Sequence, residues 1–173
     1  MRSDELRALQ SPLKARYRED PAAASITLRA EGELGSEGVS CSVQTGKALV
    51  EAGLHPASGG DGSLACSGDM LLEALVACAG VTLRSVAVNR NIAVTGGRVL
   101  AEGDLDFRGT MAVDRETPVG FRSIRLRFEL VSEAAPEELE ALLALTERYC
   151  VVYQTLNRGP ELDVTLERAA AAA

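Results

Sequence analysis

The sequence is poor in aromatic residues, in histidine and in paired metal-ligand motifs. Only 3% of its 173 residues are aromatic and there is no tryptophan, so aliphatic side chains must build the core. The single histidine, His55, and the absence of any Cys-x-x-Cys or His-Glu-x-x-His pair argue against a conventional zinc site. We therefore expect no metal centre.

Positive charge is also scarce. The chain has 18 Lys and Arg against 25 Asp and Glu, a net charge of −7, and no cluster of basic residues. Such a surface repels phosphate backbones and anionic lipid, so we expect neither a nucleic-acid nor a membrane partner. The charged stretch 1–20 has no apolar segment of the kind that secretory signals contain. The apolar stretch 69–88 holds Asp69, Glu73 and Arg84, which favours a buried helix of a cytoplasmic protein over a membrane span.

The periodicity of apolar residues predicts a mixed fold. Alternation of apolar and polar residues predicts strands over residues 25–34, 38–46, 98–107, 120–132 and 161–168. Helical spacing predicts helices over residues 2–18, 69–90 and 135–150, with one more helical turn from Val151 onward. The Gly-rich connection between the second strand and the central helix has room for a short element at 47–52, and Ser67 is a candidate N-cap for that helix. The order of elements predicts the α+β class with antiparallel sheets.

The central helix over 69–90 is apolar on nearly every face, so it must be covered all round. One small sheet covers only one side of a helix. The other side needs a second sheet, most simply from a second subunit, and we therefore expect an intimate homodimer. We divide the chain into an N-terminal helical arm (1–24), a single domain (25–168) and a tail (169–173).

Four cysteines are the residues that stand out chemically: Cys41, Cys66, Cys78 and Cys150. In a cytosolic chain of this size they are not expected to form structural disulfides. Cys78 lies in the middle of the apolar helix, where a cysteine can serve as a small core residue or as a reactive thiol. Cys150 follows the helix over 135–150. If "VVYQTL" begins a new helical turn, its backbone N–H groups favour a thiolate; otherwise Cys150 only ends one helix and packs on the core.

The other candidates are less well placed. Cys66 precedes Cys78 by twelve residues, which corresponds to about 18 Å along a continuous helix, so the two thiols meet only if the loop folds back. Cys41 shares a strand face with apolar neighbours and is expected in the core. His55 lies in the long loop and can be a proton donor or a solvated side chain.

Two segments together resemble a known family. "SGDMLLEALVACAGVTLRSVA" followed about 70 residues later by "ERYCVVYQTL" resembles the osmotically inducible protein C and organic hydroperoxide resistance (OsmC/Ohr) superfamily. The resemblance covers roughly residues 25–168. It implies swapped dimers in which two sheets wrap two central helices. It also implies a peroxidase of organic hydroperoxides in oxidative-stress defence, with no cofactor. Cys78 would be oxidised to a sulfenic acid, Cys150 would form a disulfide with it, and a cellular dithiol would reduce that bond.

This sequence departs from the family's pattern at several supporting positions. Family peroxidases place an arginine near the first hairpin, but "GELGSEG" has none, which leaves Arg16, Arg18 and Arg29 as candidates to stabilise the thiolate. Asp69 best matches the acidic residue at the start of the central helix, and Val151 replaces the usual proline after the second cysteine. Cys66 is an additional thiol and the alternative candidate for resolving the sulfenic acid. The alternative to a peroxidase is a non-catalytic dimer that binds an apolar small molecule or senses redox state.

Overall fold

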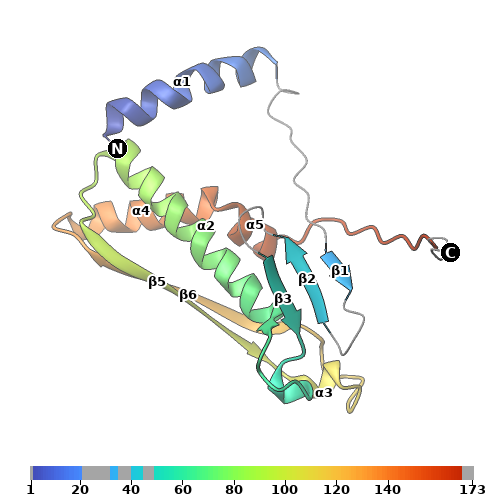
Figure 1. Ribbon diagram of the computed structural model, residues 1–173. Helices are drawn as coiled ribbons and strands as arrows, with labels where there is room; N and C mark the ends of the chain where they lie inside the picture. Colours follow the sequence, from blue (N-terminus) through green and yellow to red (C-terminus); the bar gives the residue numbers. More distant parts are fainter. Residues whose placement is uncertain (1, 21–31, 35–39, 45–48, 169–173) are drawn as a thin grey trace.

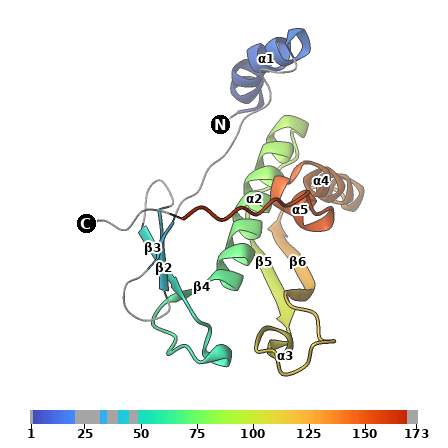
Figure 2. The same cartoon turned by 90° about the vertical axis from the view of Figure 1, so that its right-hand side faces the viewer.

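The computed structural model describes residues 2–20, 32–34, 40–44 and 49–168 of the chain (Figure 1). Its centre is one long helix, α2 (Ser67–Arg90), which lies between two sheets whose strands are mainly antiparallel (Figure 2). On one side is the hairpin of β5 (Gly96–Leu105) and β6 (Phe121–Val131), with two further helices next to it, α4 (Pro136–Tyr149) and α5 (Val151–Asn157). The expected α+β class is confirmed.

The second sheet has four strands in the order β1-β2-β3-β4. It consists of β1 (Gly32–Leu34), β2 (Ser40–Gln44), β3 (Leu49–Gly53) and β4 (Ala65–Cys66). The first three strands pair antiparallel, as the expected hairpin requires, whereas β4 runs parallel to β3. The remaining residues of the first two predicted strands, 25–31, 38–39 and 45–46, lie outside the described residues. The short element expected at 47–52 is present as β3.

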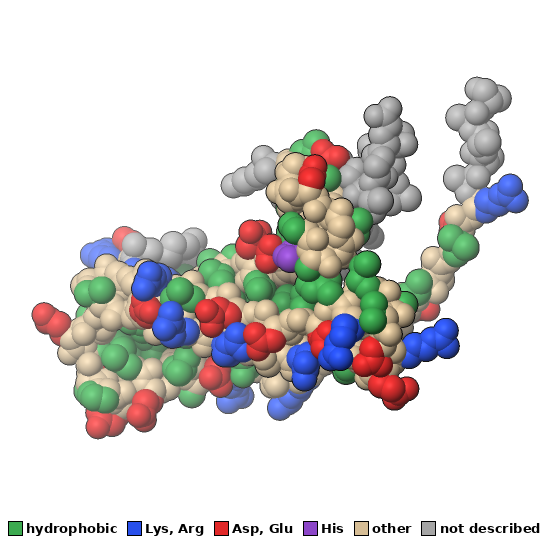
Figure 3. Space-filling model, turned by 90° about the horizontal axis from the view of Figure 1, so that it is seen from below, with side chains coloured by type: hydrophobic (Ala, Val, Ile, Leu, Met, Phe, Trp, Pro, Cys, Tyr) green, Lys and Arg blue, Asp and Glu red, His purple; other side chains and the backbone are tan. Residues whose placement is uncertain are grey.

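The β5–β6 hairpin follows from the alternating sequence of residues 120–132. Ile124, Leu126 and Phe128 are partly buried toward the helices, while Arg125 and Arg127 are exposed on the other face. Acidic and basic side chains mix along this outer face, as Figure 3 shows from below. They form exposed cross-strand ion pairs: Arg98 and Glu129 lie directly opposite each other, whereas Arg125 lies opposite Glu102 and binds Asp104 diagonally. The hairpin is therefore half solvated, as the sequence predicted.

The core lies where α2 meets the hairpin and α4. Leu83, Ala87, Val94 and Leu142 form a buried cluster, with Phe128 packed against it. Pro136 begins α4 because a proline at the first helical position loses no hydrogen bond there.

Two predictions are wrong, one about the residue that caps the start of α2 and one about a strand over residues 161–168. The N-cap of α2 is Cys66 rather than Ser67, which already lies in the helix, and the Cys66 side chain makes no capping hydrogen bond. Residues 161–168 form no strand; Leu162, Val164 and Leu166 are almost fully exposed in an extended segment that leaves the body after α5. Apolar alternation indicates a strand, but a strand also needs a partner, and the single chain offers this segment none.

Only one face of the central helix is fully buried in the described part of the chain. Its buried residues are Leu75, Ala79, Leu83 and Ala87, which follow one another at intervals of four and so form a single stripe. On another face, Val81 is 72% exposed. Among the described residues, α2 is the only helix that has the length and apolar composition to cross a membrane, a test that core helices also pass.

The remaining elements lie near the two ends of α2. The N-terminal helix α1 (Ser3–Glu19) contains Pro12 and lies by the Arg90 end. A single 3₁₀ turn, η2 (Pro56–Ser58), and the short helix α3 (Phe107–Thr110) lie near the Ser67 end, where the rings of His55 and Phe107 stack with centroids 5.1 Å apart.

Candidate functional site

Two cysteines meet where α2, α4 and α5 converge. Cys78 is in the middle of α2 and is half buried, whereas Cys150 is 1% exposed at the junction of α4 and α5. The backbone of Cys150 serves both helices: its N–H donates to the Thr146 carbonyl and its C=O accepts from the Gln154 N–H, each at 2.9 Å. The helical turn expected from Val151 is confirmed as α5, and Cys150 is its N-cap.

The start of α5 is directed at the thiol of Cys78. The backbone N–H groups of Val151 and Val152 donate hydrogen bonds to this sulfur, as does the thiol of Cys150. The Thr82 hydroxyl, one helical turn further along α2, is a fourth donor. Every one of these groups gives a hydrogen bond to sulfur, and an ionised sulfur accepts such bonds best.

Burial and hydrogen bonding act in opposite directions on Cys78. Burial alone would raise the pKa of its thiol, but the hydrogen bonds outweigh that effect and hold the pKa below its ordinary value. Cys150 differs. Burial raises the pKa of the Cys150 thiol, the Tyr153 N–H opposes the rise, and the hydrogen bond to Cys78 and the negative charge there reinforce it. The pair therefore combines one thiol that ionises readily with one that keeps its proton.

Cys66 and Asp69 lie at the other end of α2. They precede Cys78 by twelve and nine residues, so the helical rise separates them from it by about 18 and about 14 Å along the axis. Both line a second cavity, of about 260 Å³, together with His55 and Glu73. The structure thus brings Cys78 together with Cys150 and does not bring it together with Cys66 or Asp69.

The three candidate arginines are not gathered at the cysteines. Arg16 is exposed on α1, which lies by the Arg90 end of α2. The side chain of Arg18 and the whole of Arg29 lie outside the described residues. None of the leading contributions to the pKa of Cys78 comes from an arginine.

A cavity of about 690 Å³ shares helices with the cysteine pair, because α2, α4 and α5 all contribute residues to its wall. It is bounded by β6, α4 and α5, and mostly apolar side chains such as Phe128, Leu143 and Leu156 line it. Its lining includes Leu75, three residues before Cys78, and Glu147 and Tyr153, each three residues from Cys150. Neither cysteine itself lines the cavity in this single chain.

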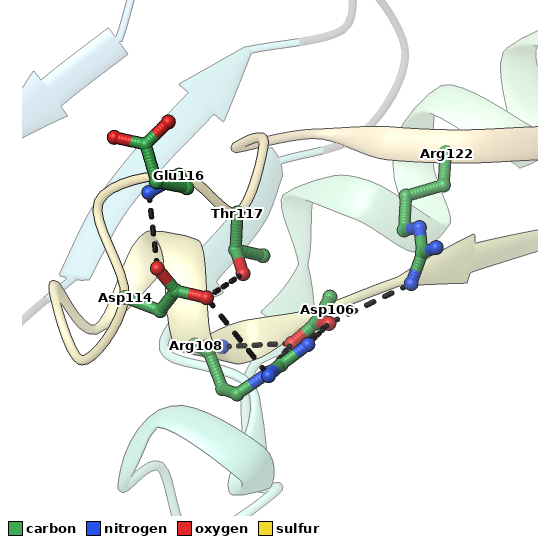
Figure 4. A network of polar contacts seen from close by, with 6 residues as sticks. All are labelled: Asp106, Arg108, Asp114, Glu116, Thr117 and Arg122. Carbon is green, nitrogen blue, oxygen red and sulfur yellow. Dashed lines mark hydrogen bonds and ion pairs between the residues drawn. The ribbon is translucent and has the colours of Figure 1, made fainter.

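A polar network holds the connection between β5 and β6 (Figure 4). Asp106 binds the guanidinium of Arg108 at 2.6 Å and lies 3.6 Å from that of Arg122, and Asp114 accepts from the Thr117 hydroxyl at 2.7 Å. The hydrogen bonds from Arg108 lower the pKa of Asp106 to about 2. This network braces the end of the hairpin near α3, away from the cysteine pair.

Sequence reasoning missed the donors around Cys78. Thr82 could have been found, because a hydroxyl four residues after a cysteine lies on the same face of a helix. The amides of Val151 and Val152 could not, because only the folded structure brings the start of α5 to the middle of α2.

Two neighbouring cysteines lie where α2, α4 and α5 meet, and only one face of the apolar helix α2 is fully buried. These features define the chain as a small α+β protein with a pair of free thiols. The model of the OsmC-like protein family matches residues 60–165, and the chain belongs to this family. That range contains α2, both cysteines and the hairpin between them.

Solved structures share the fold at low sequence identity. An OsmC-like protein from Mycoplasma pneumoniae is 17% identical with a TM-score of 0.65, over 78% of this chain and 90% of that one. An organic hydroperoxide resistance protein OsmC from Legionella pneumophila is 20% identical with a TM-score of 0.60, over the same shares of the two chains. An organic hydroperoxide resistance protein from Elizabethkingia anophelis is 17% identical with a TM-score of 0.55, again over 78% and 90%. A search among curated proteins found no match. The resemblance read from the sequence is confirmed at the level of family and fold.

Proposed function

We propose that this chain is a thiol-dependent peroxidase that reduces organic hydroperoxides through Cys78 and Cys150. The observation that carries the proposal is the hydrogen-bonded thiol pair, in which Cys78 has a lowered pKa and Cys150 a raised one. The thiolate is the nucleophilic form of cysteine, so these shifts support Cys78 as the attacking thiol and Cys150 as the thiol of the later, resolving step.

In the first step the Cys78 thiolate attacks the terminal oxygen of the hydroperoxide. The S–O bond forms as the O–O bond breaks, and the leaving alkoxide takes up one proton and becomes the alcohol. Sulfur is oxidised to the sulfenic acid and the peroxide is reduced. The donors at Val151, Val152 and Thr82 hold the thiolate in place before this attack.

In the second step Cys150 attacks the sulfenic sulfur. The disulfide forms, and the hydroxyl leaves as water with the proton that Cys150 gives up. A cellular dithiol then reduces the disulfide and is itself oxidised. Sulfur chemistry alone completes this cycle, which needs no metal, flavin or haem.

The surroundings of the pair favour an organic hydroperoxide over hydrogen peroxide. The large cavity that shares helices with the pair is lined mainly by apolar side chains from β6, α4 and α5. An alkyl chain gains free energy by leaving water for such a surface, whereas hydrogen peroxide has no apolar part to bury. Two of the fold relatives are named organic hydroperoxide resistance proteins, which agrees with this substrate class.

We further propose that the working form is a cytoplasmic homodimer. The open side of α2, where Val81 is exposed, would be covered by the second copy. The extended segment with Leu162, Val164 and Leu166 exposed at alternate positions would become a strand by pairing with that copy. Light scattering tests this directly: a stable dimer is expected, and a monomer at micromolar concentration would contradict it.

Turnover of cumene hydroperoxide with a dithiol reductant tests the peroxidase proposal. Cys78→Ser and Cys150→Ser should both reduce consumption to the rate of free thiol, while Cys66→Ser should retain the wild-type rate as the matched control. Full activity in both of the first two variants would reject the proposal. Loss of activity in Cys66→Ser with activity retained in Cys150→Ser would assign resolution to Cys66 instead.

A second function is favoured by the position of the cavity. Neither cysteine lines its wall, so the cavity is also suited to hold an apolar small molecule without chemistry, in a dimer that binds a ligand or senses redox state. In that case the protein consumes hydroperoxide no faster than free thiol does and binds an apolar probe saturably.

A further inference from the structure

We propose that Gln154 is a positioning residue for the resolving thiol. Its side chain joins α5 to the end of α4 and so holds Cys150, which lies between the two helices, in the orientation from which it attacks. This inference rests on the proposed function and adds to it the residue that places the second cysteine.

The end of α4 leaves a backbone group without a partner inside that helix. The last carbonyls of an α-helix have no intrahelical donor, and a left-handed glycine after the helix often supplies one. After α4 comes Cys150 instead, with φ −73° and ψ 109°, an extended conformation that turns the chain out of the helix. The N–H of Cys150 donates to the Thr146 carbonyl, so the next carbonyl, that of Glu147, depends on a donor from beyond the turn.

Gln154 supplies that donor. Its side-chain Nε2 donates a hydrogen bond to the Glu147 carbonyl at 2.8 Å, across seven residues of chain. Within the described part of the chain, this is the only side-chain hydrogen bond between α4 and α5. The backbone N–H of Gln154 donates to the Cys150 carbonyl at 2.9 Å. One residue therefore holds both the cysteine and the end of the helix before it.

The small size of α5 makes this hydrogen bond important. Isolated helices shorter than about 12–15 residues are marginal in water, and α5 has seven residues, none of which is buried in the single chain as described. It packs on α2 and α4 (Figures 1 and 2), but Val151 and Leu156 remain exposed. Cys150 is 1% exposed, so its side chain changes direction only if one of the two helices moves. Fixing α5 on α4 therefore fixes Cys150.

The test measures how fast Cys150 completes a disulfide, without any hydroperoxide. The Cys78 thiolate first attacks oxidised glutathione, a small-molecule disulfide; a Cys78–glutathione disulfide forms and one glutathione thiolate leaves. The Cys150 thiolate then attacks the Cys78 sulfur, the second glutathione leaves as thiolate, and the Cys78–Cys150 bond forms. Two protein thiols are oxidised and one glutathione disulfide is reduced. Quenching with iodoacetamide, which alkylates free thiols, and mass spectrometry with fragment localisation measure each species.

The second step is compared in variants from pH 6 to pH 11. Gln154→Met keeps the length and helix propensity of the side chain and removes the donor, whereas Gln154→Lys keeps a donor. Thr155→Val changes the exposed neighbour on α5 and is the matched control. Gln154→Ala, a good helix former that is too short to reach Glu147, repeats the comparison if Gln154→Met does not fold. Thermal unfolding followed by circular dichroism checks the fold of each variant.

We expect Gln154→Met to slow the second step by about three- to tenfold, as loss of one hydrogen bond implies. This step starts from the Cys78–glutathione disulfide, so the ionisation of Cys78 does not enter its rate. The midpoint of the pH profile reports the ionisation of Cys150 and should stay unchanged, whereas the plateau at high pH reports its position and should fall. Gln154→Lys and Thr155→Val should keep the wild-type profile.

Three results would overturn the inference. They are an unchanged plateau in the folded variant without the donor, a Gln154→Lys plateau as low as that of Gln154→Met, and a wild-type protein that forms no Cys78–Cys150 bond with glutathione. A lowered plateau in Gln154→Met without hydroperoxide turnover by the wild type would reject the proposed function and keep the role of Gln154. Hydroperoxide turnover with equal plateaus would keep the proposed function and reject that role.

Discussion

The middle and the start of the same helix place a cysteine in very different surroundings. Cys78, in the middle of α2, is partly buried and its thiolate is favoured by hydrogen bonds that include the backbone N–H groups of Val151 and Val152 at the start of α5. Cys66, at the N-cap, lines a small cavity with the carboxyl-bearing residues Asp69 and Glu73. Both thiols belong to one apolar helix, so the helix itself does not decide which of them is reactive. We propose that the segment that packs against each cysteine sets its reactivity, which is testable by altering the middle and the start of α2 in matched ways.

The largest expected effect is on stability. Leu75→Ala, in the middle of α2, removes a side chain that is 1% exposed and should cost about 2–5 kcal/mol of unfolding free energy, because a buried cavity results. Leu71→Ala, one turn earlier, removes a side chain that is 38% exposed and should cost about 1 kcal/mol, because water reaches the site. Urea unfolding at a fixed protein concentration measures both. Equal losses of unfolding free energy in the two variants would contradict the difference in burial between the middle and the start of α2.

The next effect concerns the reactivity of Cys78. Cys150→Ala removes one thiol donor and should raise the pKa of Cys78, so that alkylation of Cys78 at pH 7 slows by about three- to tenfold. Cys66→Ala is the matched change at the start of α2 and should leave that rate as it is. The comparison fails if both variants slow the alkylation of Cys78 equally, or if neither variant slows it.

The smallest effect is a pH dependence at the end of the hairpin near α3. The pKa of Asp106 is lowered to about 2 by the hydrogen bonds from Arg108, so its ionised form stabilises the fold. A depressed pKa means that this contribution is complete above the unfolded pKa, which is about 4, and is lost as the pH falls through about 2. Asp106→Asn should therefore be less stable than wild type at pH 6, and the difference should shrink toward zero as the pH falls below about 2. Thermal unfolding across that range checks this, and alkylation of Cys78 should not change.

Most of the fold could be predicted from the sequence, because periodicity reports which face of an element is buried. It located α2, β6 and α4 within a few residues, and of the two alternatives it left open for Cys150 the structure has the one with a new helix after it. It failed at residues 161–168, where alternation indicates a strand but pairing depends on a partner that lies elsewhere. It also failed at Ser67, because many residues near a helix start have the composition of an N-cap.

The site could be predicted only in part, since spacing along the chain gives distances within one helix but not between two. Spacing correctly separated Cys66 from Cys78, because both lie on or next to the same helix. It could not identify the amides of Val151 and Val152 as neighbours of Cys78, because those contacts depend on how α5 packs on α2. The role of an arginine could not be assigned from spacing for the same reason.

The central claim is that Cys78 and Cys150 act as a redox pair. Its most direct test is a count of free thiols in the reduced protein before and after one equivalent of cumene hydroperoxide, with mass mapping of any bridge. We predict rapid loss of two thiols and a Cys78–Cys150 disulfide. Four unchanged thiols would contradict the claim, and a Cys66–Cys78 bridge would contradict the assignment of the resolving residue.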